Sequence, residues 1–230
     1  FNMIDGLIII GLGQHTKNKI IPILKELNIC VKGILTSTNL KKFKNINLYN
    51  SLDHLLKKEK VSHCIISTTP SKHFFYIKKL LPLGIKLYVE KPAFVNKENN
   101  VLLNKYLEKE NNLLTEGLMY RFGDAYKYLR DNFLEKNLNF EEVIIKFILP
   151  NNFMKTPSFR DSLDKKNSII YDIGPYIVDM IWVLQIFDFQ IKRLKIEKFE
   201  NTILKKISFL IYPKNKLLQK LNITFGYDEI

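Results

Sequence analysis

The stretch IIIGLGQHTKNKIIPILK, Ile8–Lys25, runs from an apolar β-branched segment through two glycines into a helix-forming segment. Gly11 and Gly13 permit a tight turn and let the backbone approach a ligand closely. A pyrophosphate in that turn would lie at the helix amino terminus, where free amides and the helix dipole favour negative charge. Thr16 stands at the third position of the G-x-G-x-x-G pattern, a departure that still provides a small residue. This order of strand, glycine turn and helix predicts a dinucleotide-binding site.

Short apolar runs alternate with helix-period stretches from this point onward, which indicates an α/β fold. Runs of the kind expected for strands covered on both faces span residues 6–10, 31–36, 63–68, 85–90 and 113–116. Helix candidates span residues 17–27, 51–59, 71–83 and 96–110, and Gly84 suits the end of the third. The alternation predicts a parallel sheet with right-handed crossovers. We expect a Rossmann dinucleotide-binding domain over residues 1–120.

Strands dominate the second half of the chain. Four strand candidates span residues 140–149, 190–199, 203–212 and 217–226, and helix candidates span residues 124–136 and 170–187. Turn residues between the later strands predict antiparallel neighbours. We expect a second, α+β domain over residues 121–230, built on an open, mainly antiparallel sheet and joined without a flexible linker.

The composition argues against several classes of function. The net charge of +13 is spread along the whole chain instead of clustering, and only four of the 36 basic residues are arginines, so we expect no nucleic-acid partner. Cys30 and Cys64 lie in apolar runs without metal-ligand spacing, so we expect reduced cysteines and no metal. The apolar run 7–12 is too short to span a bilayer. A cytoplasmic enzyme fits these features.

The acid that usually holds the ribose hydroxyls of NAD is missing from its expected place, about twenty residues after the glycine turn. No Asp or Glu occurs between Glu26 and Asp53. The second strand ends instead in three hydroxyl residues, Thr36, Ser37 and Thr38. These hydroxyls, with Lys41 and Lys42 nearby, can bind a 2′-phosphate through charge-assisted hydrogen bonds. We therefore expect NADP(H) to be preferred over NAD(H).

The stretch LYVEKPAFVN, Leu87–Asn96, places Glu90, Lys91 and Pro92 directly after a strand candidate. Either this is a solvated charge pair before a strand-ending proline, or it is functional, because open α/β sheets place their chemistry at the carboxyl ends of parallel strands. Oxidation of an alcohol by hydride transfer requires loss of the hydroxyl proton, and an ammonium beside that oxygen stabilises the developing charge. Lys91 can supply that ammonium.

Further candidates lie in YDIGPYIVD, Tyr171–Asp179, where Asp172 and Tyr176 are four residues apart and share a face if the segment is helical. Taken alone, they fit better as a capping aspartate and a partly buried tyrosine. Arg121 and Arg160 are two of the four arginines, which suggests bidentate binding of a substrate carboxylate, phosphate or sugar diol. A structural ion pair is an equally good interpretation of each.

Five segments, taken in order, resemble the Gfo/Idh/MocA family, the glucose-fructose oxidoreductase and inositol dehydrogenase group: GLGQHTKNKIIPIL, STTPSKH, VEKP, EGLMYRF and YDIGPYIVD. The resemblance covers residues 6 to about 190. It implies an amino-terminal dinucleotide-binding domain and a second domain whose open sheet commonly mediates homo-oligomerisation. It also implies that Lys91 reaches the nicotinamide and the reacting substrate oxygen, and that the Lys91–Pro92 bond is often cis.

The resemblance assigns the remaining candidates. It places Asp172 and Tyr176 opposite Lys91. Many relatives have His at the position of Tyr176, whereas the glucose-fructose oxidoreductase branch resembles this chain in having Tyr. It implies cofactor contacts near the nicotinamide from Thr69, Pro70, His73, Glu90 and Lys91, and near the glycine turn from Gln14 and His15. His73 fits an ordinary helix surface equally well, and His15 a solvated loop. Relatives continue with more strands and a final helix, so we expect the second domain to be incomplete.

These features predict an NAD(P)-dependent oxidoreductase. It would transfer a hydride between the nicotinamide cofactor and a secondary alcohol or ketone of a sugar, nucleotide sugar or related polyol. The alternative is a non-catalytic NAD(P)-binding regulatory or sensor protein of the same fold, and the presence of Lys91, Asp172 and Tyr176 counts against it.

Overall fold

The computed structural model describes residues 4–38, 42–108, 112–135, 140–150, 169–199, 204–214 and 218–228. The chain divides into two compact units, Phe1–Gly117 and Leu118–Ile230. The sequence placed the boundary slightly later, after residue 120.

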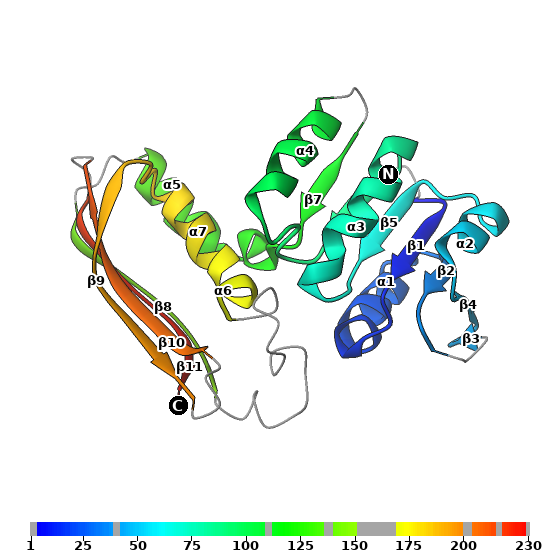
Figure 1. The fold of residues 1–230 in the computed structure, drawn as a ribbon, viewed down its shortest axis with the longest axis horizontal. Coiled ribbons are helices and arrows are strands. Elements are labelled where there is room, and N and C mark those ends of the chain that lie inside the picture. The colour runs from blue at the N-terminus through cyan, green and yellow to red at the C-terminus, as the bar shows by residue number, and fades with distance from the viewer. Residues whose placement is uncertain are drawn as a thin grey trace. The chain divides into compact units, whose positions relative to one another are not determined.

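The first unit is built on a seven-stranded sheet in the order β3-β4-β2-β1-β5-β6-β7 (Figure 1). Its strands are β1 (Leu7–Ile10), β2 (Val31–Leu35), β3 (Lys42–Phe43), β4 (Ile46–Tyr49), β5 (His63–Ile66), β6 (Lys86–Val89) and β7 (Leu114–Glu116). All neighbours are parallel except the β3–β4 hairpin. The prediction of a parallel α/β sheet is confirmed.

Helices cover both faces of this sheet. A π-helical turn (Thr16–Ile20) leads into α1 (Ile21–Glu26), and α2 (Leu52–Lys58), α3 (Pro70–Leu80), a 3-10 turn (Leu81–Leu83) and α4 (Lys97–Leu107) follow. Ile8 and Ile10 pack with residues of α2 and α3, whereas Leu7 and Ile9 pack with α1. Successive side chains of a strand point to opposite faces, so a strand buried on both sides needs the unbroken apolar run that β1 provides.

The second unit packs helices on one face of a four-stranded sheet, as Figure 1 shows for α5 and α7. Its elements are a 3-10 turn (Met119–Phe122), α5 (Asp124–Glu135), β8 (Phe140–Pro150), α6 (Ile169–Asp172), α7 (Gly174–Val183), β9 (Phe189–Lys198), β10 (Leu204–Pro213) and β11 (Leu218–Asp228). Ile177 of α7 packs in one core with Leu221, Ile223 and Phe225 of β11. Because strand side chains alternate, the neighbouring residues of β11 face away from the helices.

The sheet face that turns away from these helices carries cross-strand charge pairs. The Lys220 ammonium lies 3.1 Å from a Glu142 carboxylate oxygen. The Lys206 ammonium lies 2.6 Å from Asp228 and 3.4 Å from Glu197. This open face therefore combines charge pairs with exposed apolar side chains such as Ile144, in contrast to the apolar face under α7.

Two details of the sheets differ from the sequence prediction. The β3–β4 hairpin was missed because its turn uses Lys44 and Asn45, both with positive φ (48° and 68°), in place of the usual glycine-containing pair. The second difference is that β8 pairs in parallel with β11. The short turns that make β9, β10 and β11 antiparallel do not constrain β8, which is separated from β9 by a long connection containing α6 and α7. The sheet is still mainly antiparallel, as predicted.

Candidate active site

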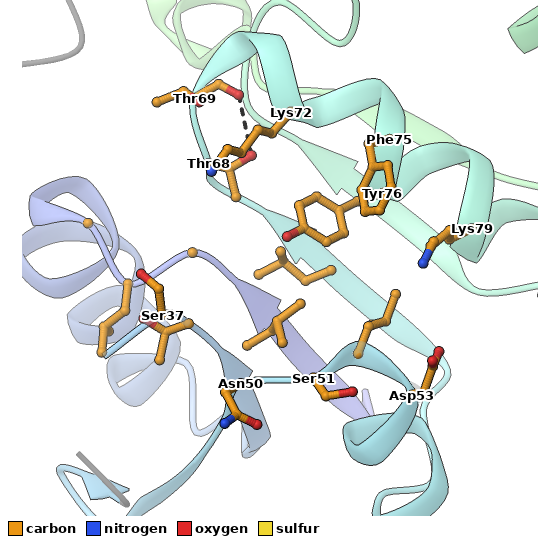
Figure 2. A pocket seen from close by; sticks show the side chains of 17 residues that line it. Ser37, Asn50, Ser51, Asp53, Thr68, Thr69, Lys72, Phe75, Tyr76 and Lys79 are labelled. Atoms are coloured by element: carbon orange, nitrogen blue, oxygen red, sulfur yellow. Dashed lines mark hydrogen bonds between the residues drawn. The ribbon is translucent and has the colours of Figure 1, made fainter. Parts of the chain in front are cut away.

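A cavity of about 600 Å³ opens at the carboxyl edge of the first sheet (Figure 2). The ends of β1, β2, β4 and β5 and the start of α3 form its wall. Its lining residues are Ile10, Gly11, Leu12, Gly13, Leu35, Thr36, Ser37, Asn50, Ser51, Leu52, Asp53, Thr68, Thr69, Lys72, Phe75, Tyr76 and Lys79. In open α/β sheets this edge is where ligands bind.

The glycine turn has the geometry that a phosphate site requires. Gly11 has φ +103°, and a Cβ there would lie 2.2 Å from the Ser67 carbonyl oxygen, so only glycine fits. A Cβ on Gly13 would meet nothing within 4 Å, which leaves that side of the backbone open to a ligand. Thr16, in place of the third glycine, is fully buried and donates from Oγ1 to Ser67 Oγ at 3.1 Å. The turn therefore fits the pyrophosphate of a dinucleotide.

The hydroxyl residues after β2 lie beside this turn. Thr36 and Ser37 line the cavity, and the Ser37 side chain is exposed. The Thr38 amide lies 3.4 Å from Thr36 Oγ1, and Thr38 is outside the lining set. Lys42 lies on β3 and does not line the cavity, whereas Lys41 falls outside the described residues.

Sequence reasoning missed one wall of the cavity, which helix α3 supplies. Lys72, Phe75, Tyr76 and Lys79 all line it, at spacings of three, four and seven residues from the first, which is one face of a helix. The segment SKHFFYIKK contained that signal. Asn50, Ser51 and Asp53 were also missed as cavity residues, because the strand that leads to them, β4, was not recognised.

The backbone around Lys91 is fixed on both sides at the carboxyl end of β6. The Glu90 amide donates to the Ile66 carbonyl oxygen at 2.9 Å. The Ala93 amide donates to a Glu116 carboxylate oxygen at 2.9 Å. The Lys91–Pro92 bond is cis, as the resemblance implied. Lys91 therefore extends from a defined backbone position.

His73 is buried beneath this loop, with only 1% of its surface exposed. Its Nδ1 lies 2.7 Å from the Pro92 carbonyl oxygen and its Nε2 lies 3.0 Å from the Thr68 carbonyl oxygen. Burial lowers the pKa of His73, and the two carbonyl oxygens oppose that effect. Both ring nitrogens face backbone oxygens, and His73 is outside the cavity lining. These contacts suit a positioning role better than the predicted direct contact with the cofactor.

Glu90 lies between the glycine turn and the end of β7. Its Oε1 is 3.3 Å from His15 Nε2, a contact that becomes an ion pair when His15 is protonated. The same Oε1 is buried and receives no hydrogen bond from the described part of the chain. A Cβ on Gly117 would lie 3.3 Å from Glu90 Oε2, so the glycine leaves room for this carboxylate. An acceptor without a donor is a group that N–H or O–H groups of a bound ligand would satisfy.

One candidate of the second unit, Tyr176, lies in an aromatic cluster. Asp172 ends α6 and is 3% exposed, and Tyr176 is the third residue of α7. The Tyr176 ring stacks on Phe147 with centroids 4.9 Å apart and an angle of 7°. The Tyr120 ring meets Tyr176 edge-on at 5.5 Å. The cluster fixes the ring of Tyr176.

Arg121 makes the bidentate contact that its scarcity suggested, but with a residue of its own unit. Its Nε donates to Asp179 Oδ2 at 2.9 Å, and its terminal nitrogen pairs with Oδ1. Asp179 is 5% exposed and also accepts from the Tyr120 hydroxyl. The hydrogen bond to Asp179 raises the pKa of Arg121, and burial raises the pKa of Tyr120. Arg160 lies outside the described residues.

Gln14 and Pro70 occupy the starts of the helices that flank the cavity. Gln14 follows Gly13 in the helical stretch before α1, and Pro70 is the first residue of α3 after Thr69, which lines the cavity. Within the described residues, no three His, Cys, Asp or Glu side chains are grouped as a metal site would need. None of the described helices is both long enough and apolar enough to cross a bilayer.

The parallel sheet, the glycine turn and the cavity at its carboxyl edge together define a nucleotide-binding Rossmann domain, joined to a helix-on-sheet unit. Residues 6–118 match the Gfo/Idh/MocA family, described as an oxidoreductase family with an NAD-binding Rossmann fold. The match covers the first unit of the chain, in agreement with the family that the sequence motifs predicted.

Related proteins agree with this assignment. An uncharacterized oxidoreductase from Schizosaccharomyces pombe is 27% identical over 161 residues, which cover 67% of this chain and 43% of that protein. The chain thus matches less than half of that relative's length. An oxidoreductase from Thermotoga maritima superposes with a TM-score of 0.82 at 16% identity, over 98% of this chain and 73% of that one. A 3-ketoreductase from Actinomadura kijaniata, solved with NADP, superposes with a TM-score of 0.80 at 16% identity, over 97% and 70%. At such identities the two superpositions show a shared fold.

Proposed function

We propose that this protein is an NAD(P)-dependent oxidoreductase. It interconverts a secondary alcohol and a ketone on a sugar, nucleotide sugar or related polyol. The observation that carries the proposal is the fixed backbone on either side of Lys91, held by Glu116 and His73 at the carboxyl edge of the sheet that bears the dinucleotide cavity. A solvated charge pair at a strand end would not need such support.

The residues of the first unit have defined tasks in this scheme. The amides of the turn at Gly11 and Gly13 bind the pyrophosphate, and Thr36 and Ser37 lie on the side of the adenosine ribose. When bound, the nicotinamide accepts or gives the hydride. In ketone reduction the Lys91 ammonium would stabilise the negative charge that develops on the reacting oxygen and donate the proton to it; in alcohol oxidation the neutral amine of Lys91 would take that proton.

Asp172 and Tyr176 are proposed as the proton-handling partners of Lys91. A buried carboxylate near an ammonium stabilises its charged form, and a tyrosine hydroxyl can give or take a hydrogen bond at the reacting oxygen. Because a tyrosine has a higher ordinary pKa than a histidine, Lys91 carries more of the acid–base work than it would beside a histidine. Asp179 binds Nε and one terminal nitrogen of the Arg121 guanidinium. Arg121 is proposed to contribute to substrate binding through the part of the guanidinium that remains exposed.

A preference for NADP(H) is part of the proposal. Ser37 is exposed at the cavity wall, and the nearest carboxylate of the lining, Asp53, lies across the cavity from it (Figure 2). A 2′-phosphate beside Ser37 would therefore meet a hydroxyl and not a negative charge. The 3-ketoreductase with the same fold binds NADP, which is consistent with this choice.

We also propose that the protein forms a homo-oligomer through the open face of the second sheet. That face carries the pairs of Lys220 with Glu142 and of Lys206 with Glu197 beside the exposed side chain of Ile144. Such an interface would be sensitive to salt, because partly exposed ion pairs are screened. Light scattering after size-exclusion chromatography at low and high salt measures the mass directly, and a monomer under both conditions would contradict the oligomer.

The test of the function is a combined binding and turnover screen. Dinucleotide binding is measured first, by thermal shift and by titration with NADH and NADPH, since a ligand that binds the folded state raises its stability. Oxidation of a panel of sugars, nucleotide sugars and polyols is then followed by the absorbance of reduced cofactor. Binding together with turnover supports the oxidoreductase. Binding without turnover on any substrate would favour the regulatory alternative, and absence of binding would contradict both.

A further inference from the structure

Helix α3 places two lysines in the wall of the dinucleotide cavity, at opposite ends. Lys72 lies in the first turn of α3, directly after the carboxyl end of β5, and Lys79 lies two turns later. In Figure 2 the Lys72 side chain extends past Thr68, whereas Lys79 lies at the other end of the helix wall, on the side of Asp53. Thr68 borders the glycine turn, because its backbone nitrogen lies 3.2 Å from where a Cβ on Gly11 would stand. The two ammonium groups therefore face different parts of a ligand that spans the cavity.

Lys72 is the cation that the glycine-turn end of the cavity presents. The charged residues of the lining are Asp53, Lys72 and Lys79, and two of these lie at the far end. The turn itself offers neutral amides, and the Thr16 hydroxyl points to Ser67 instead of into the cavity. A pyrophosphate carries two negative charges, and amides alone leave them without a counter-charge. An ammonium within reach supplies a charge-assisted hydrogen bond.

We propose that Lys72 binds the pyrophosphate of the dinucleotide and closes the phosphate site from the side of α3. This inference rests on the proposed cofactor. It makes a distinct claim, because the pyrophosphate is common to NAD and NADP, whereas the 2′-phosphate belongs only to NADP. A lysine at the pyrophosphate contributes equally to both cofactors. A lysine at the 2′-phosphate would favour NADPH alone.

The experiment compares dissociation constants of NADH and NADPH, measured by fluorescence titration, for the full chain and four variants. Lys72→Met removes the charge and keeps the apolar stem, and Lys72→Arg keeps the charge. Lys78→Met is the matched control, because it lies on the same helix, is exposed and does not line the cavity. Lys79→Met removes the cation at the far end. Thermal unfolding without ligand shows that each variant is folded.

The expected result is that Lys72→Met weakens NADH and NADPH by the same factor, about tenfold, as loss of one charge-assisted contact implies. Lys72→Arg should recover part of the affinity, and Lys78→Met should bind as the parent does. Added salt should weaken the parent more than Lys72→Met, since screening acts on the lost charge. A loss confined to NADPH, or a loss equal to that of Lys78→Met, would overturn the assignment of Lys72 while leaving the proposed function intact. Failure of the parent to bind either cofactor would overturn both.

Discussion

His73 Nδ1 lies 2.7 Å from the carbonyl oxygen of Pro92, the residue that follows Lys91. The other ring nitrogen lies 3.0 Å from the carbonyl oxygen of Thr68, which lines the cavity. One buried side chain thus links the loop of the cavity wall to the loop that carries the candidate catalytic lysine. We infer that His73 is a positioning residue, because a shift of either loop changes its contacts with the other.

The contact with Pro92 predicts different effects for two replacements of His73. The amide nitrogen of His73→Asn can stand near the position of Nδ1 and donate to Pro92, whereas that of His73→Gln stands nearer the position of Nε2 and Thr68. Turnover should therefore fall less in His73→Asn than in His73→Gln, with little change in the dissociation constant of the cofactor. Steady-state kinetics and cofactor titration measure the two quantities separately. His54→Gln, on the exposed surface of α2, is the control.

An equal loss in both His73 variants, accompanied by an equal loss of stability, would show a merely structural histidine. A positioning role predicts that turnover falls while the dissociation constant of the cofactor stays unchanged, which a packing role alone does not predict.

Stability should decrease as the pH falls below about 6.5. Burial lowers the pKa of both His63 and His73 from their ordinary value of 6.5. Between the lowered pKa of the folded state and 6.5, the unfolded chain binds more protons than the folded chain. The free energy of unfolding therefore increases with pH across this interval, and the full gain is reached above about pH 6.5. Denaturant unfolding at about pH 7.5, 6.5 and 5.5 measures the slope. The slope should be smaller in His73→Asn, and an unchanged slope would assign the effect to other groups.

Two glycines of the same turn should respond oppositely to alanine. In Gly11→Ala the new Cβ would lie 2.2 Å from the Ser67 carbonyl oxygen at a φ of +103°, so the free energy of unfolding should fall by roughly 1–3 kcal/mol. In Gly13→Ala the Cβ enters open space, so stability should hardly change. It would occupy the approach of the pyrophosphate, however, and cofactor affinity should fall. Denaturant unfolding and cofactor titration of both variants check the contrast, and normal cofactor binding by Gly13→Ala would place the phosphates elsewhere.

The cofactor preference should depend on Ser37. Ser37→Asp places a carboxylate beside the proposed 2′-phosphate site, so NADPH should lose affinity relative to NADH by about tenfold or more. Asn28→Asp, an exposed position after α1 and outside the cavity lining, is the matched control for the change in net charge. Competitive titration with the two reduced cofactors gives the ratio. If the parent binds both equally, the missing acid after β2 has no bearing on the choice.

The sequence predicted the fold correctly where a segment carried a strong local pattern. The unbroken apolar run of β1 and the glycines at 11 and 13 gave the strand, the turn and the helix, because burial on two faces and a positive φ leave few other sequences possible. The β3–β4 hairpin gave no such signal, since Lys44 and Asn45 adopt positive φ without glycine. Missing β4 also hid Asp53 as a cavity residue.

The candidate site also contains residues that the sequence could reveal and contacts that it could not. Lys91 could be found from its place after a buried strand, but the supporting contacts of His73 and Glu116 depend on residues 18 and 25 positions away, and no local pattern encodes them. For Arg121 the sequence predicted the kind of contact but not the partner. Its rarity predicted a bidentate partner, and the chain itself supplies one in Asp179, 58 residues later.

Replacement of Lys91 is the most direct test of catalysis. Lys91→Ala should lower turnover by roughly two to four orders of magnitude while leaving folding and most cofactor affinity intact, since the ammonium acts on the reacting oxygen. Lys91→Arg should also be slow, because an always-protonated, forked guanidinium cannot exchange the proton or occupy the same point-charge position. Lys86→Ala, at the exposed start of the same strand, is the matched control. Steady-state kinetics with a substrate from the screen, beside cofactor titration, gives the comparison.

Asp172 belongs to the other unit of the chain, so its coupling to Lys91 tests whether residues of both units act on one substrate. If the two groups share a proton network, Asp172→Asn should lower turnover in the same direction as Lys91→Ala. The double variant should then cost less than the sum of the single losses, because the second change removes a function that the first has already disabled. Additive losses would mean that the two residues act independently. Near-native turnover in Lys91→Ala would return Glu90 and Lys91 to a solvated charge pair at a strand end and favour the regulatory alternative.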